Sequence, residues 1–327
     1  MIMERIGILG AGTWGVALAR MLCIKGHDVT VWSALPEEIE SLSKTRQHPN
    51  LPSSNIPDDI VFTSDIEEAV KGMRIVVFAV PSVFIRSTSR TAAPFIEKGQ
   101  ILVNVSKGIE EGTFKSMTEI MGEEITTPGI YLVALSGPTH AEEVSRDMPT
   151  TIIAACEDQG VAGIVADAFR GENMKVYTDT DVKGIELCGA LKNVIALAAG
   201  ISAGMGYGDN ARAALIARGM AEIASLGVKM GCSSSSFWGL AGIGDLIVTA
   251  TSVHSRNNKC GYLMGQGMSC EDATREVGMV VEGINALPAA LSLAQKYDVK
   301  MPIIEAVDDI VKGRKTPSEV VRFLMDS

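Results

Sequence analysis

The sequence has little of what several protein classes require. Basic residues are outnumbered, with 29 lysines and arginines against 39 aspartates and glutamates, and the formal net charge is −10. Proteins that bind nucleic acid or anionic membranes in a general way need a basic surface, so this charge disfavours both classes. A small anionic substrate held by a few local cations is still compatible with it.

Cysteine, histidine and long apolar runs are also scarce. The six cysteines form no C-x-x-C pair, so we expect reduced, packed thiols in a cytoplasmic protein. Four scattered histidines do not make a metal site, and we predict no metal. No stretch holds about 18 uncharged apolar residues, so a transmembrane helix is not expected. The first residues lead directly into a strand, so we expect no signal peptide.

A glycine-rich segment follows the first predicted strand. Ile6–Leu9 reads as a buried strand, and Gly10, Gly12 and Gly15 form the pattern G-x-G-x-x-G before a helix and a second strand at 29–32. In such a unit the first glycine makes a tight turn, the second lets the backbone approach a pyrophosphate, and the third permits close helix–strand packing. The helix N-terminus faces the phosphates. The segment predicts a dinucleotide site.

The end of the second strand does not choose between NAD and NADP. An acidic residue there would bind the ribose 2′-hydroxyl of NAD, and an arginine would accept the 2′-phosphate of NADP. The chain has Ser33, Ala34 and Leu35 at this point, and Glu37 and Glu38 open the next predicted helix. The predicted cofactor is therefore NAD or NADP.

The 327 residues predict two domains. Apolar runs that read as buried strands alternate with helices as far as Tyr177, and from Lys183 onward the chain reads as helical. We predict an α/β fold with a Rossmann-type, doubly wound, mostly parallel sheet over residues 1–182. An all-helical domain should follow over residues 183–327. No Gly/Pro-rich linker separates them, so we expect tight packing.

The helical run at 183–200 is apolar on nearly every side, which is typical of a buried helix. Lys192 lies within it, and lysine is almost never fully buried unless it is paired or used. The helix alone leaves a snorkelling side chain and a catalytic one equally open. Because the helix begins where the strands stop, we expect Lys192 at the seam between the domains and predict that it is catalytic.

Loops at the carboxyl ends of parallel strands are where ligands bind. Pro81, Lys107 and the segment 137–139 follow three predicted strands. Lys107 could meet a substrate there, or it could be a solvated loop lysine.

In the helical half, two further stretches carry polar candidates. Asp245 lies among glycines, and it could hold a fixed loop or cap a helix. Arg256 lies between Ser255 and Asn257 and would suit a phosphate or a carboxylate, although a solvated loop is the simpler alternative.

Eight stretches, in order and over almost the whole chain, resemble the bacterial NAD(P)-dependent glycerol-3-phosphate dehydrogenase family. They are Gly10–Gly15, Ala79–Ser82, Ser106–Glu110, Leu135–Val144, Glu186–Ala196, Gly239–Leu246, Ser255–Asn257 and Val280–Gly283. The resemblance implies a cytoplasmic oxidoreductase that interconverts dihydroxyacetone phosphate and sn-glycerol 3-phosphate and supplies the backbone of phospholipids.

The resemblance also implies roles for individual residues. Lys192 looks like the general base and acid on the C2 oxygen of the substrate. Substrate contacts are implied for Lys107, Gly137, Thr139, Lys192, Asp245, Ser255, Arg256 and Asn257. Cofactor contacts are implied for Thr13, Trp14, Lys107, Ala141, Arg256, Val280 and Glu282, and position in the chain adds Gly10, Gly12, Gly15, Ser33 and Pro81.

The chain departs from the family pattern at a few positions. Thr13 and Thr139 replace frequent serines and keep the hydroxyl, whereas Ser33 and Ala34 stand where many members have arginine or histidine. Two other functions stay open: a two-domain hydroxyacid dehydrogenase acting on a carboxylate, and a non-enzymatic dinucleotide sensor, which the acidic charge disfavours. The apolar second half makes a homodimer plausible.

Overall fold

The computed structural model describes residues 3–320, and the chain divides into two compact units. The first comprises Met1–Ser106 and Met117–Val182, and the second comprises Lys107–Ser116 and Lys183–Ser327. Residues 107–116 therefore pack with the second unit, although they precede the predicted domain boundary at 182/183.

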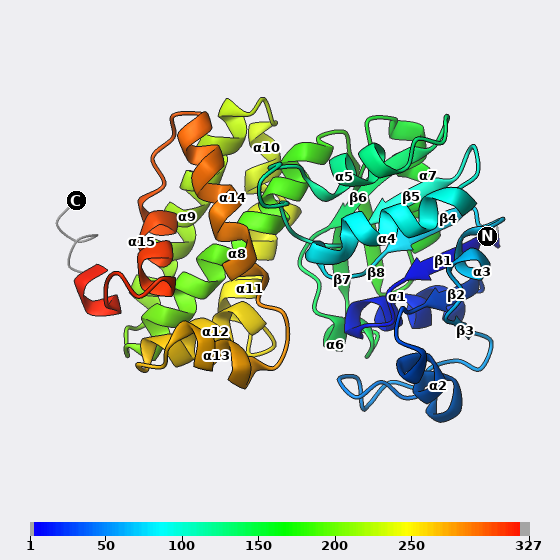
Figure 1. Cartoon of the computed structure of the whole chain (residues 1–327), viewed down its shortest axis with the longest axis horizontal. Coiled ribbons are helices and arrows are strands. Elements are labelled where there is room, and N and C mark those ends of the chain that lie inside the picture. The colour runs from blue at the N-terminus through cyan, green and yellow to red at the C-terminus, as the bar shows by residue number, and fades with distance from the viewer. Residues whose placement is uncertain (1–2, 321–327) are drawn as a thin grey trace. The chain divides into compact units, whose positions relative to one another are not determined.

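The first unit contains, among its described residues, one eight-stranded sheet with helices against it (Figure 1). Neighbouring strands are parallel except for the antiparallel pair β6–β7. The order is β3-β2-β1-β4-β5-β6-β7-β8, so the chain reverses its direction of travel across the sheet between β1 and β4, which is a topological switch point. The prediction of a doubly wound, mostly parallel sheet is confirmed. The strands are β1 (Arg5–Leu9), β2 (Asp28–Trp32), β3 (Val61–Thr63), β4 (Ile75–Phe78), β5 (Ile101–Asn104), β6 (Tyr131–Ser136), β7 (Thr150–Ala155) and β8 (Met174–Asp179).

The central strands read as continuous apolar runs because both of their faces are covered. In β4, Ile75 and Val77 belong to one buried cluster, and Val76 and Phe78 belong to another, as the two-residue period of a strand requires. The first cluster takes in α1 (Thr13–Ile24), α2 (Pro36–Thr45) and α7 (Gln159–Phe169), and the second takes in α3 (Ile66–Val70), α4 (Ile85–Ala92) and α5 (Met117–Glu124).

The second unit is built around α8 (Val182–Gly204), in which every residue from Gly184 to Ser202 is buried. By length and composition α8 could cross a membrane, but its apolar stretch lies entirely inside the structure, so it is a core helix. The predicted all-helical second half is confirmed. The helices around α8 are α9 (Asp209–Lys229), α10 (Ser234–Trp238), the π-helical turn Leu240–Gly244, α11 (Asp245–Thr251), α12 (Arg256–Gly265), α13 (Cys270–Val277), α14 (Glu282–Lys296) and α15 (Pro302–Val311).

Glycines bring α8 and α12 into close contact. A Cβ atom on Gly200 would lie 2.1 Å from the carbonyl oxygen of Asn258, and one on Gly261 would lie 2.1 Å from that of Leu197. Only hydrogen fits at either position. The contact fixes the beginning of α12, which carries Arg256, against the helix that carries the buried lysine.

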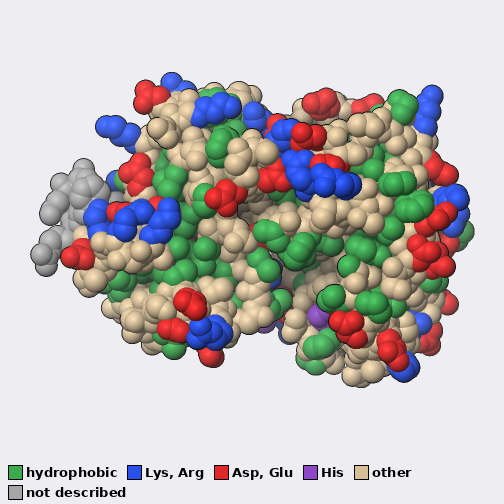
Figure 2. All heavy atoms as spheres, in the orientation of Figure 1, with side chains coloured by type: hydrophobic (Ala, Val, Ile, Leu, Met, Phe, Trp, Pro, Cys, Tyr) green, Lys and Arg blue, Asp and Glu red, His purple; other side chains and the backbone are tan. Residues whose placement is uncertain are grey.

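Charged side chains of both signs mix on the face of the molecule that Figure 2 shows. Figure 2 shows lysine and arginine side chains on this face next to aspartates and glutamates rather than in one large basic patch. Arg86 and Arg90, for example, both form ion pairs with Glu124.

Candidate active site

The second unit holds a buried cluster around Lys192. Its ammonium donates hydrogen bonds to Oδ1 of Asp245 at 2.5 Å and to the Thr249 hydroxyl at 2.6 Å. Lys192 is 4% exposed and Asp245 is 1% exposed, so this ion pair is withdrawn from solvent. The lysine is thus paired inside the unit, and the snorkelling alternative is wrong.

Asp245 follows the π-helical turn and is the first residue of α11, whose N-cap is Gly244. The carboxylate therefore does not act as the N-cap. Thr249 lies one turn further along α11 and donates its hydroxyl to the Asp245 carbonyl oxygen at 2.7 Å. Positions i and i+4 share a face of a helix, and this face is directed at Lys192.

A second lysine reaches the same carboxylate. Lys107 donates to Oδ2 of Asp245 at 2.6 Å, and its side chain is 18% exposed. The segment from 107 to 116 is fixed to the second unit by Ile109, which is part of its core, and by Ser116, whose hydroxyl donates to the buried Glu186 of α8 at 2.5 Å. Lys107 is therefore not a solvated loop lysine.

The surroundings lower the pKa of Lys192 from 10.5 to about 7. Burial is the largest cause because it penalises the charged form; Asp245 opposes it, and the Lys107 cation adds to it. An amine that titrates near neutral pH can both donate and accept a proton under physiological conditions.

An amide network joins the turn of Lys192 to α12 and α14. The side chain of Asn257 donates to Oδ1 of Asn193 at 3.0 Å, and its own Oδ1 accepts the backbone N–H of Gly283 at 2.8 Å. Asn193 in turn donates to the Gly189 carbonyl oxygen at 3.2 Å. The Asn257 amide is thus committed to holding three helices together.

The helix α12 begins at the end of this network. Ser255 is its N-cap and accepts the backbone N–H of Asn258 at 3.2 Å. Arg256 is the first helical residue and is exposed, and no residue in the described range forms an ion pair with it. A helix N-terminus with an adjacent arginine has the donors and the positive potential that suit a phosphate.

In the first unit, the glycine loop has the geometry of a dinucleotide site. Gly10 has a φ of +124°, and a Cβ on Gly15 would lie 2.0 Å from the Gly10 carbonyl oxygen, so only glycine fits at these positions. A Cβ on Gly12 would meet nothing within 4 Å, which leaves the backbone open at the N-terminus of α1. Thr13 and Trp14 are the first residues of that helix.

The other predicted contacts of the first unit lie at strand ends. Pro81 follows β4, and Gly137 follows β6 with a φ of +151°. The Thr139 hydroxyl donates to the Gly137 carbonyl oxygen at 3.1 Å, and Ala141 begins α6 (Ala141–Val144).

Ser33 follows β2, is buried, and donates its hydroxyl to Glu38 at 2.5 Å. In the second unit, Glu282 begins α14, and Val280 immediately precedes the N-cap Val281. Among residues 3–320, no group of three or more His, Cys, Asp and Glu side chains could hold a metal ion.

Comparison with known proteins identifies the family. Residues 5–162 match the model of the NAD-dependent glycerol-3-phosphate dehydrogenase N-terminus, and residues 181–322 match that of its C-terminus. The chain belongs to the NAD-dependent glycerol-3-phosphate dehydrogenase family. This confirms the predicted resemblance and the prediction of an NAD(P)-dependent oxidoreductase.

Individual members of the glycerol-3-phosphate dehydrogenase family are similar over their full length. Glycerol-3-phosphate dehydrogenase [NAD(P)+] 2 of Lactobacillus delbrueckii subsp. bulgaricus is 62% identical, over 99% of this chain and 97% of the relative. Glycerol-3-phosphate dehydrogenase [NAD(P)+] of Bacillus subtilis is 47% identical, over 99% and 94%. A crystal structure of glycerol-3-phosphate dehydrogenase from Coxiella burnetii is 31% identical, with a TM-score of 0.92 over 99% of both chains.

The structure brings together only some of the residues that were predicted to form the substrate site. Lys107, Lys192 and Asp245 meet directly. The side-chain amide of Asn257, which follows Ser255 and Arg256, donates to Asn193, the residue next to Lys192. Gly137 and Thr139 belong to the first unit. Sequence reasoning missed Thr249 and gave no role to Asn193; the four-residue spacing from Asp245 to Thr249 was the signal for the first.

Proposed function

We propose that the protein interconverts dihydroxyacetone phosphate and sn-glycerol 3-phosphate with NAD or NADP, and that Lys192 is the general acid and base. The observation that carries the proposal is the buried contact of Lys192 with Asp245 and Thr249. Support also comes from relatives that bear the name glycerol-3-phosphate dehydrogenase at 62% and 47% identity.

The hydrogen bonds of Lys192 leave one of its N–H donors for the substrate. An ammonium has three N–H donors. Two are taken by Asp245 and Thr249, and no other described residue accepts the third. That third donor is available to the C2 oxygen of the substrate, where negative charge develops during reduction.

The charges around the cluster are suited to this chemistry. Two lysines share the single carboxylate of Asp245, so the cluster carries one net positive charge when both are protonated. A fixed positive charge in a buried site stabilises a developing alkoxide strongly, because little water is present to screen it. In the reverse direction, the neutral amine of Lys192 accepts the hydroxyl proton.

The phosphate of the substrate would bind at the beginning of α12. Arg256 offers a planar pair of donors, and the first backbone N–H groups of the helix add further ones. Asn257 would contribute through its backbone, because its side-chain amide is held by Asn193 and Gly283.

The cofactor would lie along the glycine loop of the first unit. The open backbone at Gly12 and the N-terminus of α1 fit a pyrophosphate, with Thr13 and Trp14 beside it. The nicotinamide supplies the hydride when bound. Pro81, Gly137, Thr139 and Ala141 stand at the strand ends of the same unit, where ligands of such sheets bind.

In the cell, we propose a cytoplasmic enzyme that supplies the backbone of phospholipids. The resemblance of the sequence to the bacterial family supports this role. A homodimer is part of the same proposal.

One assay tests the activity. The loss of NADH or NADPH absorbance is followed with dihydroxyacetone phosphate and, in parallel, with a panel of 2-oxo and 3-oxo acids. We expect rapid turnover of dihydroxyacetone phosphate and little of any oxo acid. Preferred turnover of an oxo acid would establish the alternative of a hydroxyacid dehydrogenase, and binding of the dinucleotide without turnover of any of these compounds would favour a sensor.

A further inference from the structure

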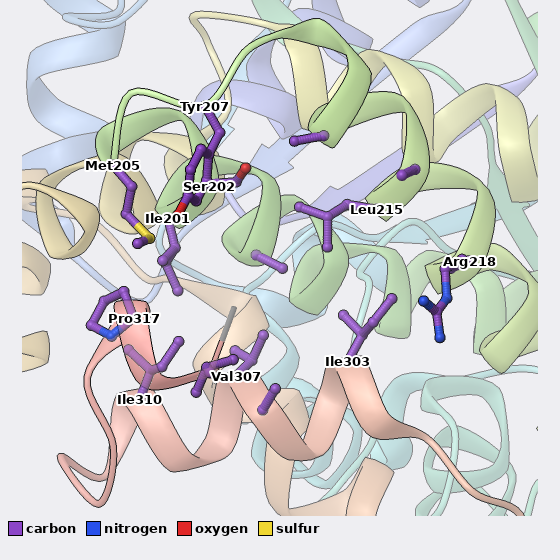
Figure 3. Close-up of a pocket in the computed structure, with 15 residues that line it drawn as sticks. Ile201, Ser202, Met205, Tyr207, Leu215, Arg218, Ile303, Val307, Ile310 and Pro317 are labelled. Carbon is purple, nitrogen blue, oxygen red and sulfur yellow. The ribbon is translucent and has the colours of Figure 1, made fainter. Parts of the chain in front are cut away.

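The second unit contains an apolar cavity away from the lysine cluster, and we propose that it binds a small amphiphile with a single anionic head. The cavity has a volume of about 170 Å³ and lies among α8, α9, α15 and the segment that follows α15 (Figure 3). Its lining is formed by Ala198, Ile201, Ser202, Met205, Tyr207, Ala211, Ala214, Leu215, Arg218, Ile303, Ala306, Val307, Ile310, Pro317 and Val320.

The cavity is apolar along its length and charged at one end. In Figure 3, Leu215 of α9 points towards α15, from which Ile303 points back, while Met205 and Pro317 lie at the end opposite Arg218. The hydroxyls of Ser202 and Tyr207 are the other side-chain polar groups in the lining. This arrangement fits an elongated apolar body with a charged group at one terminus.

The volume limits the size of the ligand. A protein cavity of about 150 Å³ can admit benzene, so about 170 Å³ accommodates an apolar group of about six carbons. Each methylene that is removed from water improves the affinity by about fourfold. A medium-chain ligand should therefore bind much better than a short one, and chains that exceed the cavity should gain little more.

Arg218 determines the charge of the head. It is exposed, and it forms no ion pair with any residue between 3 and 320. By contrast, Arg212 on the same helix pairs with Asp209 at 3.0 Å. The nearest acidic side chain on α9 is Glu222, one turn further on, whose carboxylate accepts the backbone N–H groups at the beginning of α15. The guanidinium can therefore form two parallel hydrogen bonds with a carboxylate or a phosphate.

The cavity is distinct from the lysine cluster but shares a helix with it. Ala198, Ile201 and Ser202 lie on α8, six to ten residues beyond Lys192. At a rise of 1.5 Å per residue, this corresponds to roughly 9 to 15 Å along the helix axis. A ligand of the cavity would not compete with the proposed substrate, so the two proposals can fail independently.

Calorimetric titration of the full-length protein tests the site. The probes are butanoate, hexanoate and octanoate, with 1-octanol as the neutral analogue and octyl phosphate as the alternative head. We expect affinity to rise about fourfold per methylene from butanoate to hexanoate and to level off towards octanoate, whose chain exceeds the cavity. Octanoate or octyl phosphate should bind at least several-fold more tightly than 1-octanol, and comparison of the two shows which head the arginine prefers.

Three variants test the binding of the anionic head group, the binding of the apolar chain, and a control arginine. Arg218→Gln should lose several-fold in octanoate affinity and leave 1-octanol binding unchanged, whereas the control Arg212→Gln should behave like the unmodified chain. Ala214→Phe, at an exposed position of the lining, should fill the cavity and abolish binding of both compounds. Turnover of dihydroxyacetone phosphate and the thermal unfolding temperature identify variants that still fold.

Several results would overturn the proposal. These are no saturable octanoate binding, an affinity independent of chain length, or unchanged octanoate binding in a folded Ala214→Phe variant. An octanoate affinity that falls as the protein concentration rises would instead assign the cavity to contact with a second copy of the chain.

Discussion

The buried ammonium of Lys192 lies 2.5 Å from Oδ1 of Asp245, and each group depends on the other. Removing one partner of a buried ion pair commonly costs about 3–5 kcal/mol, because the other charge is left uncompensated. Lys107, at 2.6 Å from the second oxygen, shares this carboxylate. The shared partner allows two cations to lie together. It also opposes the effect of burial, which lowers the pKa of Lys192 to about 7.

The first prediction concerns Lys192 itself. Lys192→Ala should lower kcat at least about 100-fold while cofactor binding persists, because proton transfer is lost and the glycine loop is untouched. Lys183→Ala, on the same helix, is the matched control and should leave kcat unchanged. Steady-state kinetics and a nucleotide titration measure both quantities. Near-normal turnover of Lys192→Ala would exclude the proposed role.

The second prediction is a pair of opposite pH profiles. In the proposed mechanism, reduction needs protonated Lys192, so kcat/KM should fall as the pH rises through about 7. Oxidation needs the neutral amine, so its kcat/KM should rise through the same range. Lys107→Gln removes a cation that lowers the pKa of Lys192, so both midpoints should move to higher pH. Lys98→Gln, at an exposed position, is the control. Midpoints that do not move in Lys107→Gln would show that Lys107 does not influence the titrating group.

Arg256→Ala provides the third prediction. The loss of a charged hydrogen bond to the phosphate should raise KM for dihydroxyacetone phosphate by about ten- to a hundred-fold. Turnover of unphosphorylated dihydroxyacetone should be unaffected. Arg275→Ala removes an exposed arginine that is paired with Glu271, and it should change neither value. An unchanged KM in Arg256→Ala would place the phosphate elsewhere.

Much of the fold could be predicted because its signals are local. Ile75–Phe78 and Ile101–Asn104 are short apolar runs between helices, and they are buried central strands. Val61–Thr63 could not be predicted in this way, because three residues at the sheet edge, two of them outside the core, give no such run.

The site was less accessible to sequence reasoning because its contacts are distant in the chain. Lys107 and Asp245 are separated by 138 residues, and the assignment of 107–116 to the helical unit depends on Ile109 and Ser116 rather than on any local pattern. The hydrogen bond from the Asn257 side-chain amide to Asn193 could not be predicted from the sequence either, because Asn193 lies on another helix.

The fourth prediction concerns the choice of cofactor. Glu38 accepts a 2.5 Å hydrogen bond from Ser33 at the end of β2, where the adenosine ribose binds in such units. A carboxylate there repels a 2′-phosphate, so kcat/KM should be higher with NADH than with NADPH. Glu38→Gln should improve NADPH use several-fold, while Glu37→Gln, one residue away and exposed, should not. A preference for NADPH in the unmodified enzyme would contradict this explanation.

The last prediction is a pH-dependent stability at Glu222. Its buried carboxylate accepts the N–H of Ile303 at 3.0 Å, and burial raises its pKa from 4.5 to about 7. The folded state therefore binds this proton more tightly than the unfolded state, so the stabilisation is complete below about pH 4.5 and is lost as the pH rises to about 7.

Glu222→Gln keeps an acceptor oxygen but removes this titration. The free energy of unfolding of this variant minus that of the unmodified protein should increase as the pH rises from 4.5 to about 7. The increase should reach up to about 3 kcal/mol, at 1.36 kcal/mol per unit of pKa shift. Denaturant unfolding at several pH values measures the difference. Glu276→Gln, at an exposed position of α13, should show a constant difference across the range. A constant difference in Glu222→Gln as well would mean that Glu222 titrates alike in the folded and unfolded chains.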